Sequence, residues 1–369
     1  MTWTIVHTEW SDGFGGQELR ILQECREMTR RGHRLTILCR PEAALREKGE
    51  EAGIRVVPVP IRSPADLVSV VSMARLFRGE RVDIVNTHSG KDTWVASMAA
   101  KIAGVPLLLR TRHISLPVRR RPWNLVWYWP DGYITTGEPI REHLIHEGVP
   151  ADRVVSIPTG VDGDRFSPAV SGDPIRRELE WTPGRRVISM IGVLRASKRL
   201  DLFLDVAAEI SRTDRSLAFL IVGEGPKEPE IREKIRDLRL EDVVFLLGQR
   251  ADIPEILAAT DVVVTTSVKE GLPQVILQAL AMERPVVASR VGAIPEVVVH
   301  EETGLLCPAA DVGAFVAAVR RFLSDPALGR RLGEAGRRLV LENHSVSVMG
   351  DKTEAFYRFL AQAKGGSAR

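Results

Sequence analysis

The residues best placed to do chemistry in this sequence form a short run in the second half of the chain. Glu270 and Gly271 follow a β-branched run that predicts a strand, and Leu272 begins a predicted helix. Such a loop lies at the carboxyl edge of a parallel sheet, where ligands bind in α/β folds. Gly271 permits close approach of the backbone, and the helix start offers free N–H groups to an anion. The run predicts a phosphate or sugar site; the alternative is an ordinary turn with a solvated Glu270.

Gln278 belongs to the same candidate site. It stands eight residues after Glu270, just over two turns along a helix that starts near Leu272. At that spacing the two side chains share nearly the same face. We therefore expect Gln278 to reach the same ligand.

Two cations occupy a second loop, between the first predicted strand of the second half and the helix after it. These are Arg195 and Lys198. Arginine grips phosphate through two hydrogen bonds, whereas lysine supplies a compact point charge. Together they would offset the charge of a diphosphate that leaves during a reaction. We expect a diphosphate site that needs no metal ion; the alternative is a solvated basic turn.

Two histidines end predicted strands in the first half of the chain, His88 and His113. A neutral imidazole can share a proton with a hydroxyl group, and an imidazolium can stabilise negative charge beside a phosphate. An isolated histidine is more often structural, but two at neighbouring strand ends favour a site. We expect Lys91 and Asp92, which follow His88, to shape the side that receives the second substrate.

A basic and aromatic segment lies between these histidines and the middle of the chain. No acidic residue occurs from 93 to 130. Arginine attracts anionic headgroups and tryptophan prefers the membrane boundary, each basic residue contributing about 1 kcal/mol near anionic lipid. The alternatives are a partly buried aromatic helix with solvated arginines, or recognition of an anionic acceptor. Nucleic-acid binding lacks a matching recognition fold. The residues that predict membrane contact are Arg119, Arg120, Arg121, Trp123 and Trp127.

Short β-branched runs alternate with amphipathic stretches along the whole chain. This alternation predicts an α/β fold with parallel sheets covered by helices on both faces. At 369 residues the chain exceeds what one core normally supports. A turn-rich segment, 158–168, separates two such series and predicts domains at 1–168 and 169–349. Two doubly wound halves place their ligands at the carboxyl ends of the sheets.

The composition is that of an ordinary globular protein, with 44% hydrophobic residues, 27% charged residues and a net charge of +3. The three cysteines, Cys25, Cys39 and Cys307, lack metal spacing, so we expect them to be reduced, buried and inert. Asp162-Gly-Asp164 sits in a linker, and we expect Asp162 to cap a turn rather than bind metal. Without a leader or a long apolar stretch, we expect a cytoplasmic protein that can sit peripherally on the inner face of the plasma membrane.

In order and spacing, these motifs resemble the retaining glycosyltransferases of family four, whose hallmark is Glu, seven residues, Glu, then a Gly-Gly-x-x-Glu turn. Those enzymes have the GT-B fold, two Rossmann-like doubly wound domains facing a central cleft. The resemblance covers nearly the whole chain. The matching segments are Glu270 to Gln278, Val291 to Glu296, Gly15-Gly16-Gln-Glu18 with Arg31-Gly-His33, Pro158 to Asp162, and Gly223-Glu-Gly225-Pro226.

The resemblance implies transfer of a sugar, with retention, from a nucleoside-diphosphate sugar, a UDP-sugar above others, to a glycan or lipid-linked acceptor of the cell envelope. It implies no cofactor. His113 would be the active-site histidine and Glu270 would contact the donor sugar. Gln278 would bind the ribose. The other donor-binding residues would be Gly16, Arg195, Lys198, Gly271 and Leu272. By the same resemblance, the C-terminal helix, about 350–369, would complete the first domain.

Three positions depart from the family pattern. Gln278 replaces the second Glu, Val193 stands where an Arg often follows Gly192, and Arg199 stands where a Gly usually follows the Lys. The departures at Gln278 and Arg199 keep a non-catalytic sugar-nucleotide-binding module open as an alternative. A sugar-nucleotide epimerase or hydrolase on the same two-domain scaffold is the other alternative. A dehydrogenase is disfavoured because the glycines near residue 15 lack the dinucleotide-binding spacing.

Overall fold

The computed structural model describes residues 2–113, 128–182 and 184–366. The predicted membrane-contact residues from Arg119 to Trp127 lie outside the described residues. The chain divides into two compact units, which are treated separately below. Unit 1 comprises Met1–Gly160 and Val346–Arg369, and unit 2 comprises Val161–Ser345.

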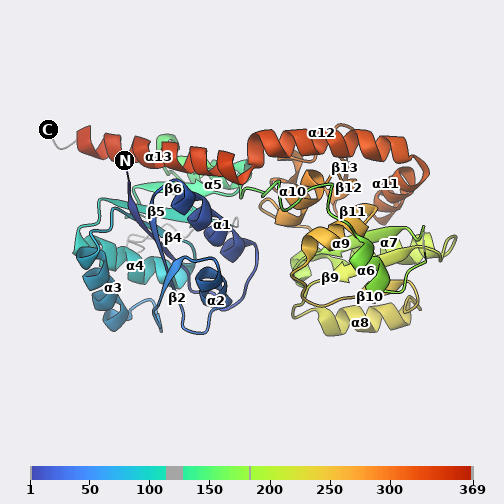
Figure 1. The fold of residues 1–369 in the computed structure, drawn as a ribbon, viewed down its shortest axis with the longest axis horizontal. Coiled ribbons are helices and arrows are strands. Elements are labelled where there is room, and N and C mark those ends of the chain that lie inside the picture. Colours follow the sequence, from blue (N-terminus) through green and yellow to red (C-terminus); the bar gives the residue numbers. More distant parts are fainter. Residues whose placement is uncertain (1, 114–127, 183, 367–369) are drawn as a thin grey trace. The chain divides into compact units, whose positions relative to one another are not determined.

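Unit 1 is built on a seven-stranded parallel sheet with the order β3-β2-β1-β4-β5-β6-β7. Figure 1 labels β2, β4, β5 and β6 of this sheet. Its strands are β1 (Thr4–Thr8), β2 (Arg34–Cys39), β3 (Arg55–Pro58), β4 (Ile84–Thr87), β5 (Leu107–Arg112), β6 (Gly132–Thr135) and β7 (Val154–Ser156). Its helices are α1 (Gly16–Arg30), α2 (Ala44–Glu51), α3 (Leu67–Gly79), α4 (Gly90–Ala103), α5 (Glu138–His146), the short η2 (Ala151–Arg153) and α13 (Val346–Gly366).

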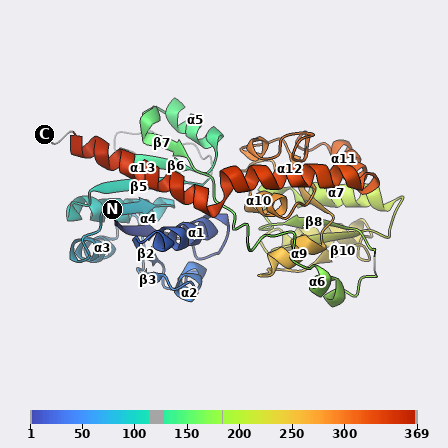
Figure 2. The same ribbon diagram turned by 45° about the horizontal axis from the view of Figure 1, so that its top comes forward.

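Helices cover both faces of this sheet because alternate strand residues point to opposite sides. Ile5 packs in a core with α1, α2 and α13, whereas its neighbour Val6 packs in a second core with α3 and α4. Ile84 and Val85 divide between the two cores in the same way. Helices α3 and α4 pack against each other, as Figure 2 also shows. The near-continuous apolar strands of the sequence are therefore those of a sheet buried on both faces.

Unit 2 repeats this plan with a six-stranded parallel sheet in the order β10-β9-β8-β11-β12-β13. Its strands are β8 (Val187–Ile191), β9 (Ala218–Val222), β10 (Val244–Leu246), β11 (Val262–Thr265), β12 (Val286–Ser289) and β13 (Leu305–Cys307). Its helices are α6 (Asp173–Glu178), α7 (Leu200–Ser211), α8 (Glu228–Asp237), α9 (Ile253–Ala259), α10 (Gln274–Ala281), α11 (Val312–Ser324) and α12 (Pro326–His344), with short turns η3 (Ala196–Lys198) and η4 (Ile294–Glu296). Alternate residues again enter opposite cores, Val187 in one and Ile188 in the other.

The prediction of two doubly wound α/β domains is confirmed. Two details differ from the sequence expectation. Residues Leu305–Cys307 form an edge strand paired with β12, where the sequence pattern predicts no strand. The strand is three residues long between Gly304 and Pro308, too short for a periodic pattern. Helix α10 begins at Gln274, after Pro273 in an extended conformation, and not at Leu272 or Pro273.

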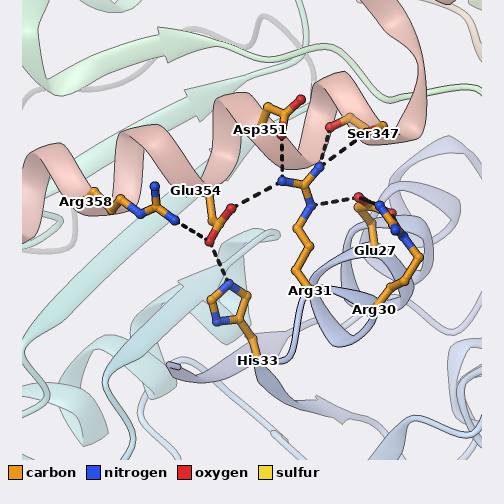
Figure 3. Close-up of polar contacts among 8 residues, drawn as sticks. All are labelled: Glu27, Arg30, Arg31, His33, Ser347, Asp351, Glu354 and Arg358. Carbon is orange, nitrogen blue, oxygen red and sulfur yellow. Dashed lines mark hydrogen bonds and ion pairs between the residues drawn. The ribbon is translucent and has the colours of Figure 1, made fainter. Parts of the chain in front are cut away.

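The Arg31-Gly-His33 motif fastens α13 to unit 1 (Figure 3). Arg31 Nη1 donates to Asp351 Oδ1 at 2.7 Å and to Glu354 Oε2 at 3.2 Å, while its Nε donates to Glu27 Oε1 at 2.7 Å. His33 Nε2 lies 3.2 Å from Glu354 Oε1. Helix α13, red in Figure 1, runs beside α1 through these contacts and through apolar packing. The motif therefore has a structural role here.

The three cysteines are free and buried, as expected. Burial raises the pKa of Cys39 and of Cys307 to about 12, and raises the pKa of Cys25 as well. A thiol with a raised pKa forms little of the reactive thiolate.

Candidate functional site

Each sheet has one point where the strand order reverses direction. In unit 1 it lies between β1 and β4, and in unit 2 between β8 and β11. Loops leave the carboxyl ends of these strands on opposite sides and open a crevice where α/β proteins bind ligands. The candidate residues from the sequence gather at these two points.

In unit 2 the structure brings Lys198 and Glu270 together. Lys198 ends η3 after β8, and Glu270 lies in the loop after β11. Lys198 Nζ is 2.6 Å from Glu270 Oε1, and Ser267 Oγ donates to the same oxygen at 2.7 Å. The side chains are only 11% and 7% exposed. Breaking a buried ion pair by removing one partner is costly, because the other charge is left away from water without its partner.

Glycine turns hold the loops around this pair. Gly223 has φ +131°, and a Cβ there would lie 2.1 Å from the carbonyl oxygen of Gly192. Gly292 has φ +54°, and a Cβ there would lie 2.0 Å from the carbonyl oxygen of Glu270. Both positions combine a left-handed backbone with backbone contact, so only glycine fits without a shift. The glycine motifs of the sequence therefore support the Lys198–Glu270 pair.

The residues after Glu270 are buried at the start of α10. Gly271 and Leu272 are both buried, and Gln278 is 8% exposed. Because α10 starts at Gln274, Gln278 lies one turn into the helix and not two. Gln274 is a residue that the sequence reasoning missed. Among the described residues its buried Oε1 and Nε2 have no hydrogen-bond partner.

Arg195 and Arg199 are more exposed to solvent than Lys198. Arg195 is exposed and lines a surface pocket of about 310 Å³ together with Lys227 and Lys234. Arg199 has φ +51°, in the left-handed region, and pairs with Asp201 at 2.8 Å. This backbone conformation gives a physical reason for the glycine that the family usually has at position 199.

In unit 1 the structure lines up three histidines, on or directly after three adjacent strands. His7 belongs to β1, His88 follows β4, and His113 follows β5. His7 Nδ1 lies 2.9 Å from His88 Nε2, and His88 Nδ1 lies 3.0 Å from His113 Nε2. The ring centroids are 5.2 and 5.3 Å apart, close to the spacing of about 4.8 Å between strands. Sequence reasoning found His88 and His113 but missed His7, whose signal was its place at the end of the first predicted strand.

The three imidazoles are neutral near pH 7. Burial lowers the pKa of His113 to about 3, with Arg20 and Arg112 acting in the same direction. Burial also lowers the pKa of His7, and it lowers the pKa of His88 well below the usual range. Neutral imidazole can accept or donate a hydrogen bond but does not supply a positive charge. Of the two roles that the sequence left open, the structure favours the neutral one.

Asp92 and Lys91 take different places beside this row. Asp92 is fully buried and accepts hydrogen bonds from Thr8 Oγ1 at 2.8 Å and from the His88 backbone N–H at 3.0 Å. It therefore shapes the strand ends. Lys91 Nζ lies 3.6 Å from the centroid of the Trp10 ring, a cation–π contact on the other side of the same turn.

Glu9 is a further candidate that the sequence reasoning missed. It is fully buried directly after β1, and its Oε1 accepts from the backbone N–H groups of Trp10 at 2.7 Å and Ser11 at 2.8 Å. Burial, aided by the nearby Asp92 charge, raises the pKa of Glu9 to about 7. An acid whose pKa lies near neutrality beside a sheet switch point is typical of functional sites.

The glycine loop before α1 leaves open space. Gly15 is the N-cap of α1, and its N–H donates to Glu18 Oε2 at 2.8 Å. A Cβ at Gly16 would meet no atom within 4 Å. The described structure itself therefore does not require glycine at position 16.

Asp162 caps a turn, as predicted. Its Oδ1 accepts from the backbone N–H groups of Asp164 at 3.1 Å and Arg165 at 3.0 Å. In the described part of the chain, no three His, Cys, Asp or Glu side chains gather as metal ligands.

Comparison with known proteins assigns the family. A model described as Glycosyltransferase Family 4 matches residues 14–165, and one described as Glycosyl transferases group 1 matches residues 172–339. The chain is 30% identical over 314 residues to the GDP-mannose-dependent alpha-(1-6)-phosphatidylinositol monomannoside mannosyltransferase of Mycolicibacterium smegmatis, covering 80% of this chain and 82% of that protein. The chain belongs to glycosyltransferase family 4.

Other relatives agree with this assignment. The family 4 chain is 29% identical over 344 residues to the UDP-Gal:alpha-D-GlcNAc-diphosphoundecaprenol alpha-1,3-galactosyltransferase of Escherichia coli, covering 88% of this chain and 89% of the relative. The crystal structure of Anabaena HepE in complex with UDP and glucose matches with a TM-score of 0.85 at 21% identity, over 96% of this chain and 98% of that one. That likeness confirms the GT-B fold of two Rossmann-like domains. The protein is thus a glycosyltransferase of the class that uses nucleotide-sugar donors.

Among the described residues, no helix has the length and apolar character needed to cross a membrane.

Proposed function

We propose that unit 2 binds the nucleoside-diphosphate sugar and that unit 1 binds the acceptor, with retention of the anomeric configuration. The observation that carries this proposal is the buried contact between Lys198 and Glu270 at the switch point of the second sheet. It provides a positive charge for the diphosphate and carboxylate oxygens for sugar hydroxyls, side by side. His113 is the candidate catalytic residue of unit 1, with His88, Lys91 and Asp92 around it.

In the proposed reaction the bond between the anomeric carbon and the diphosphate oxygen breaks, and the acceptor oxygen forms the new bond. The hydroxyl proton passes to the leaving diphosphate, which keeps the charges balanced. Lys198 and Arg195 offset the charge that develops on the diphosphate, and the N-terminal end of α10 adds favourable dipoles. The Glu270 carboxylate pairs with the Lys198 ammonium and accepts a hydrogen bond from Ser267. Because these contacts make the carboxylate less nucleophilic, it is suited to accept a hydrogen bond from a sugar hydroxyl rather than to attack the anomeric carbon.

We propose a UDP-sugar as donor. The galactosyltransferase of Escherichia coli is named for UDP-Gal, and HepE has been solved with UDP-glucose. Gln278 would hold the ribose, and Gly16, Gly271 and Leu272 would line the donor. The mycobacterial relative is named for GDP-mannose, so the base is the first property to measure.

We propose an acceptor that is lipid-linked or part of an envelope glycan. The names of two relatives contain a diphosphoundecaprenol and a phosphatidylinositol monomannoside. Unit 1 also exposes apolar side chains on α3, where Leu67 and Val68 are 68% and 78% exposed. Exposed apolar groups of this kind suit contact with a lipid surface. Sedimentation with vesicles containing anionic lipid, against neutral vesicles, tests the membrane part of this proposal.

The central experiment is a thermal-shift screen of UDP-, GDP- and ADP-sugars, followed by transfer assays with the donor that stabilises the protein most. A donor in hundredfold excess over its Kd should stabilise the fold by about 2.7 kcal/mol. Incubation with the donor alone separates transfer from epimerisation and hydrolysis, since only the latter two consume or isomerise it without an acceptor. If no sugar nucleotide stabilises the protein, the proposal is wrong.

A further inference from the structure

The row of histidines in unit 1 ends on a buried carboxylate. Glu24 of α1 is fully buried, and its Oε1 lies 3.8 Å from His7 Nε2, which is too long for a hydrogen bond but close enough for a charge to act. Among the described residues this buried nitrogen has no hydrogen-bond partner. Arg20 Nε donates to Glu24 Oε2 at 3.0 Å, and the Tyr357 hydroxyl of α13 donates to Glu24 Oε1 at 3.0 Å. Burial opposes ionisation of Glu24, but Arg20 and His7 hold its pKa below the usual range. Glu24 is therefore a carboxylate with no hydrogen to give.

A row of neutral imidazoles has only two consistent arrangements. Each ring carries one N–H and one bare nitrogen, and each contact between two rings needs one hydrogen. Either all three rings carry the hydrogen on Nε2, or all three carry it on Nδ1. The residue at the buried end selects between them because His7 Nε2 faces Glu24. A bare nitrogen pointing at a carboxylate is repelled, whereas an N–H is attracted, so all three rings carry the hydrogen on Nε2.

The consequence appears at the other end of the row. His7 and His88 are 0% and 4% exposed, whereas His113 is partly exposed. In this arrangement His113 Nε2–H donates to His88 Nδ1. The second nitrogen of His113, Nδ1, is then a bare acceptor. The Arg112 and Arg20 charges both act on His113, and at the buried end Arg20 pairs with Glu24.

We propose that Glu24, acting through His7 and His88, fixes the tautomer of His113 and so presents His113 Nδ1 as a hydrogen-bond acceptor to a substrate hydroxyl group. Glu24, His7 and His88 are positioning residues that act without touching the substrate. The role of the hydroxyl rests on the proposed function, but the tautomer is a property of the protein alone.

The first test reads the tautomers in the wild-type protein, and substitutions serve only to assign the signals. Long-range ¹H–¹⁵N correlation spectra of the full chain labelled with ¹⁵N-histidine distinguish protonated from bare ring nitrogens. Signals are assigned by their loss in His7→Gln and His113→Gln. The expected result is protonated Nε2 and bare Nδ1 for His7, His88 and His113. Protonated Nδ1 on His113 would overturn the proposal.

The second test reverses the tautomers of the three histidines. Glu24→Gln keeps the shape of the side chain, and its amide oxygen can still accept from Arg20 while its NH2 group faces His7. The hydrogens should then move to Nδ1 on all three rings. The matched control is Glu27→Gln on the same helix, whose carboxylate pairs with Arg30 and Arg31 and not with the histidines. An unchanged tautomer in Glu24→Gln would show that Glu24 does not control the row.

Activity and donor binding then separate the two proposals. With UDP as the probe, Glu24→Gln should bind as the wild type does, because Lys198, Arg195 and Gln278, which are proposed to hold the diphosphate and the ribose, lie in unit 2. Its kcat for transfer should fall about tenfold or more, as expected when a hydrogen-bond acceptor becomes a donor at a reacting hydroxyl. Wild-type kcat with reversed tautomers would overturn the functional part of this inference. Failure of the wild type to bind any sugar nucleotide would instead overturn the proposed function and leave the tautomer assignment intact.

Discussion

Lys198 Nζ lies 2.6 Å from Glu270 Oε1, and this one contact joins the loop after β8 to the loop after β11. The two residues are separated by more than seventy positions in sequence, yet each leaves an inner strand of the same sheet. The pair therefore fixes the distance between the two loops to which a donor would bind.

The first prediction concerns this pair. Lys198→Met should lower the free energy of unfolding by about 3 kcal/mol, because it leaves a buried carboxylate without its counter-charge. Glu270→Gln should cost less, since an amide can still accept from Ser267. The double variant should be more stable than Lys198→Met alone. Urea unfolding of the wild type, both single variants and the double variant measures the coupling.

Transfer activity completes that test. Glu270→Gln should lose at least tenfold in transfer while retaining most of its stability. Unchanged turnover in Glu270→Gln would remove Glu270 from the site. Additive effects of the two substitutions on unfolding would show that the pair does not act as a unit.

The second prediction concerns Gln278, which stands where the family has Glu. A carboxylate accepts hydrogen bonds from two ribose hydroxyls, whereas an amide offers one acceptor oxygen and a competing NH2 group. Gln278→Glu should therefore bind the donor more tightly, by about 1 kcal/mol. Gln249→Glu, an exposed position in the same unit, is the control for the added charge. Loss of donor binding in Gln278→Glu would show instead that the site is built around the amide.

The third prediction concerns Gly292. A Cβ there would meet the carbonyl oxygen of Glu270 at 2.0 Å, in addition to the cost of φ +54°. Gly292→Ala should destabilise unit 2 by more than about 2 kcal/mol. Gly184 has φ +86° with no atom within 4 Å of a Cβ, so Gly184→Ala carries the backbone strain alone, about 1 kcal/mol. Equal effects of the two substitutions on urea unfolding would contradict the close contact.

The sequence was sufficient for much of this architecture. Strands such as β8 and β9 are continuous apolar runs between turn residues, so their pattern predicts a sheet buried on both faces. The places of Lys198 and Glu270 follow from that prediction, because each comes after such a strand. Asp162 was correctly predicted as a turn cap because an aspartate before Gly-Asp has a local hydrogen-bonding role.

Other features depend on register and could not be predicted. The contacts of His88 with His7 and with His113 require that β1, β4 and β5 be neighbours with a particular offset, and β1 and β4 are not consecutive in the chain. The raised pKa of Glu9 depends on burial beside Asp92, which joins the same two strand ends. A single sequence carries no signal for these relationships.

The fourth prediction concerns the attachment of α13. Arg31 is 14% exposed and contacts Glu27, Asp351 and Glu354, so Arg31→Ala should destabilise unit 1 by about 1–2 kcal/mol. Arg30 pairs with the same Glu27 but is 66% exposed, so Arg30→Ala should have little effect. Hydrogen exchange of α13 is the second readout. We expect faster exchange in Arg31→Ala and not in Arg30→Ala. Equal exchange in the two variants would show that Arg31 does not hold α13 in place.

The fifth prediction concerns pH and Glu9. The pKa of Glu9 is raised from 4.5 to about 7 in the folded protein, chiefly by burial. Below pH 4.5 the carboxyl is protonated in both the folded and the unfolded chain, so its ionisation does not lower the free energy of unfolding. Between pH 4.5 and about 7 the unfolded chain has released its proton while the folded protein keeps it, so stability falls as pH rises, and the fall levels off above about 7, where both states are ionised. Glu9→Gln, which stays neutral, should be more stable than the wild type by about 3 kcal/mol at pH 8 and nearly equal to it at pH 4.5.

Urea unfolding of the wild type and Glu9→Gln at half-unit steps between pH 4.5 and 8 measures this difference. Glu18→Gln is the matched control. Glu18 is also a buried carboxylate near this loop, but it accepts a hydrogen bond from the Gly15 backbone N–H at the start of α1. The difference between wild type and Glu9→Gln should grow from pH 4.5 to about 7 and then level off, because Glu9 ionises in the unfolded wild-type chain before it ionises in the folded protein. A constant difference across this range would mean that Glu9 titrates in the folded protein as it does in the unfolded chain.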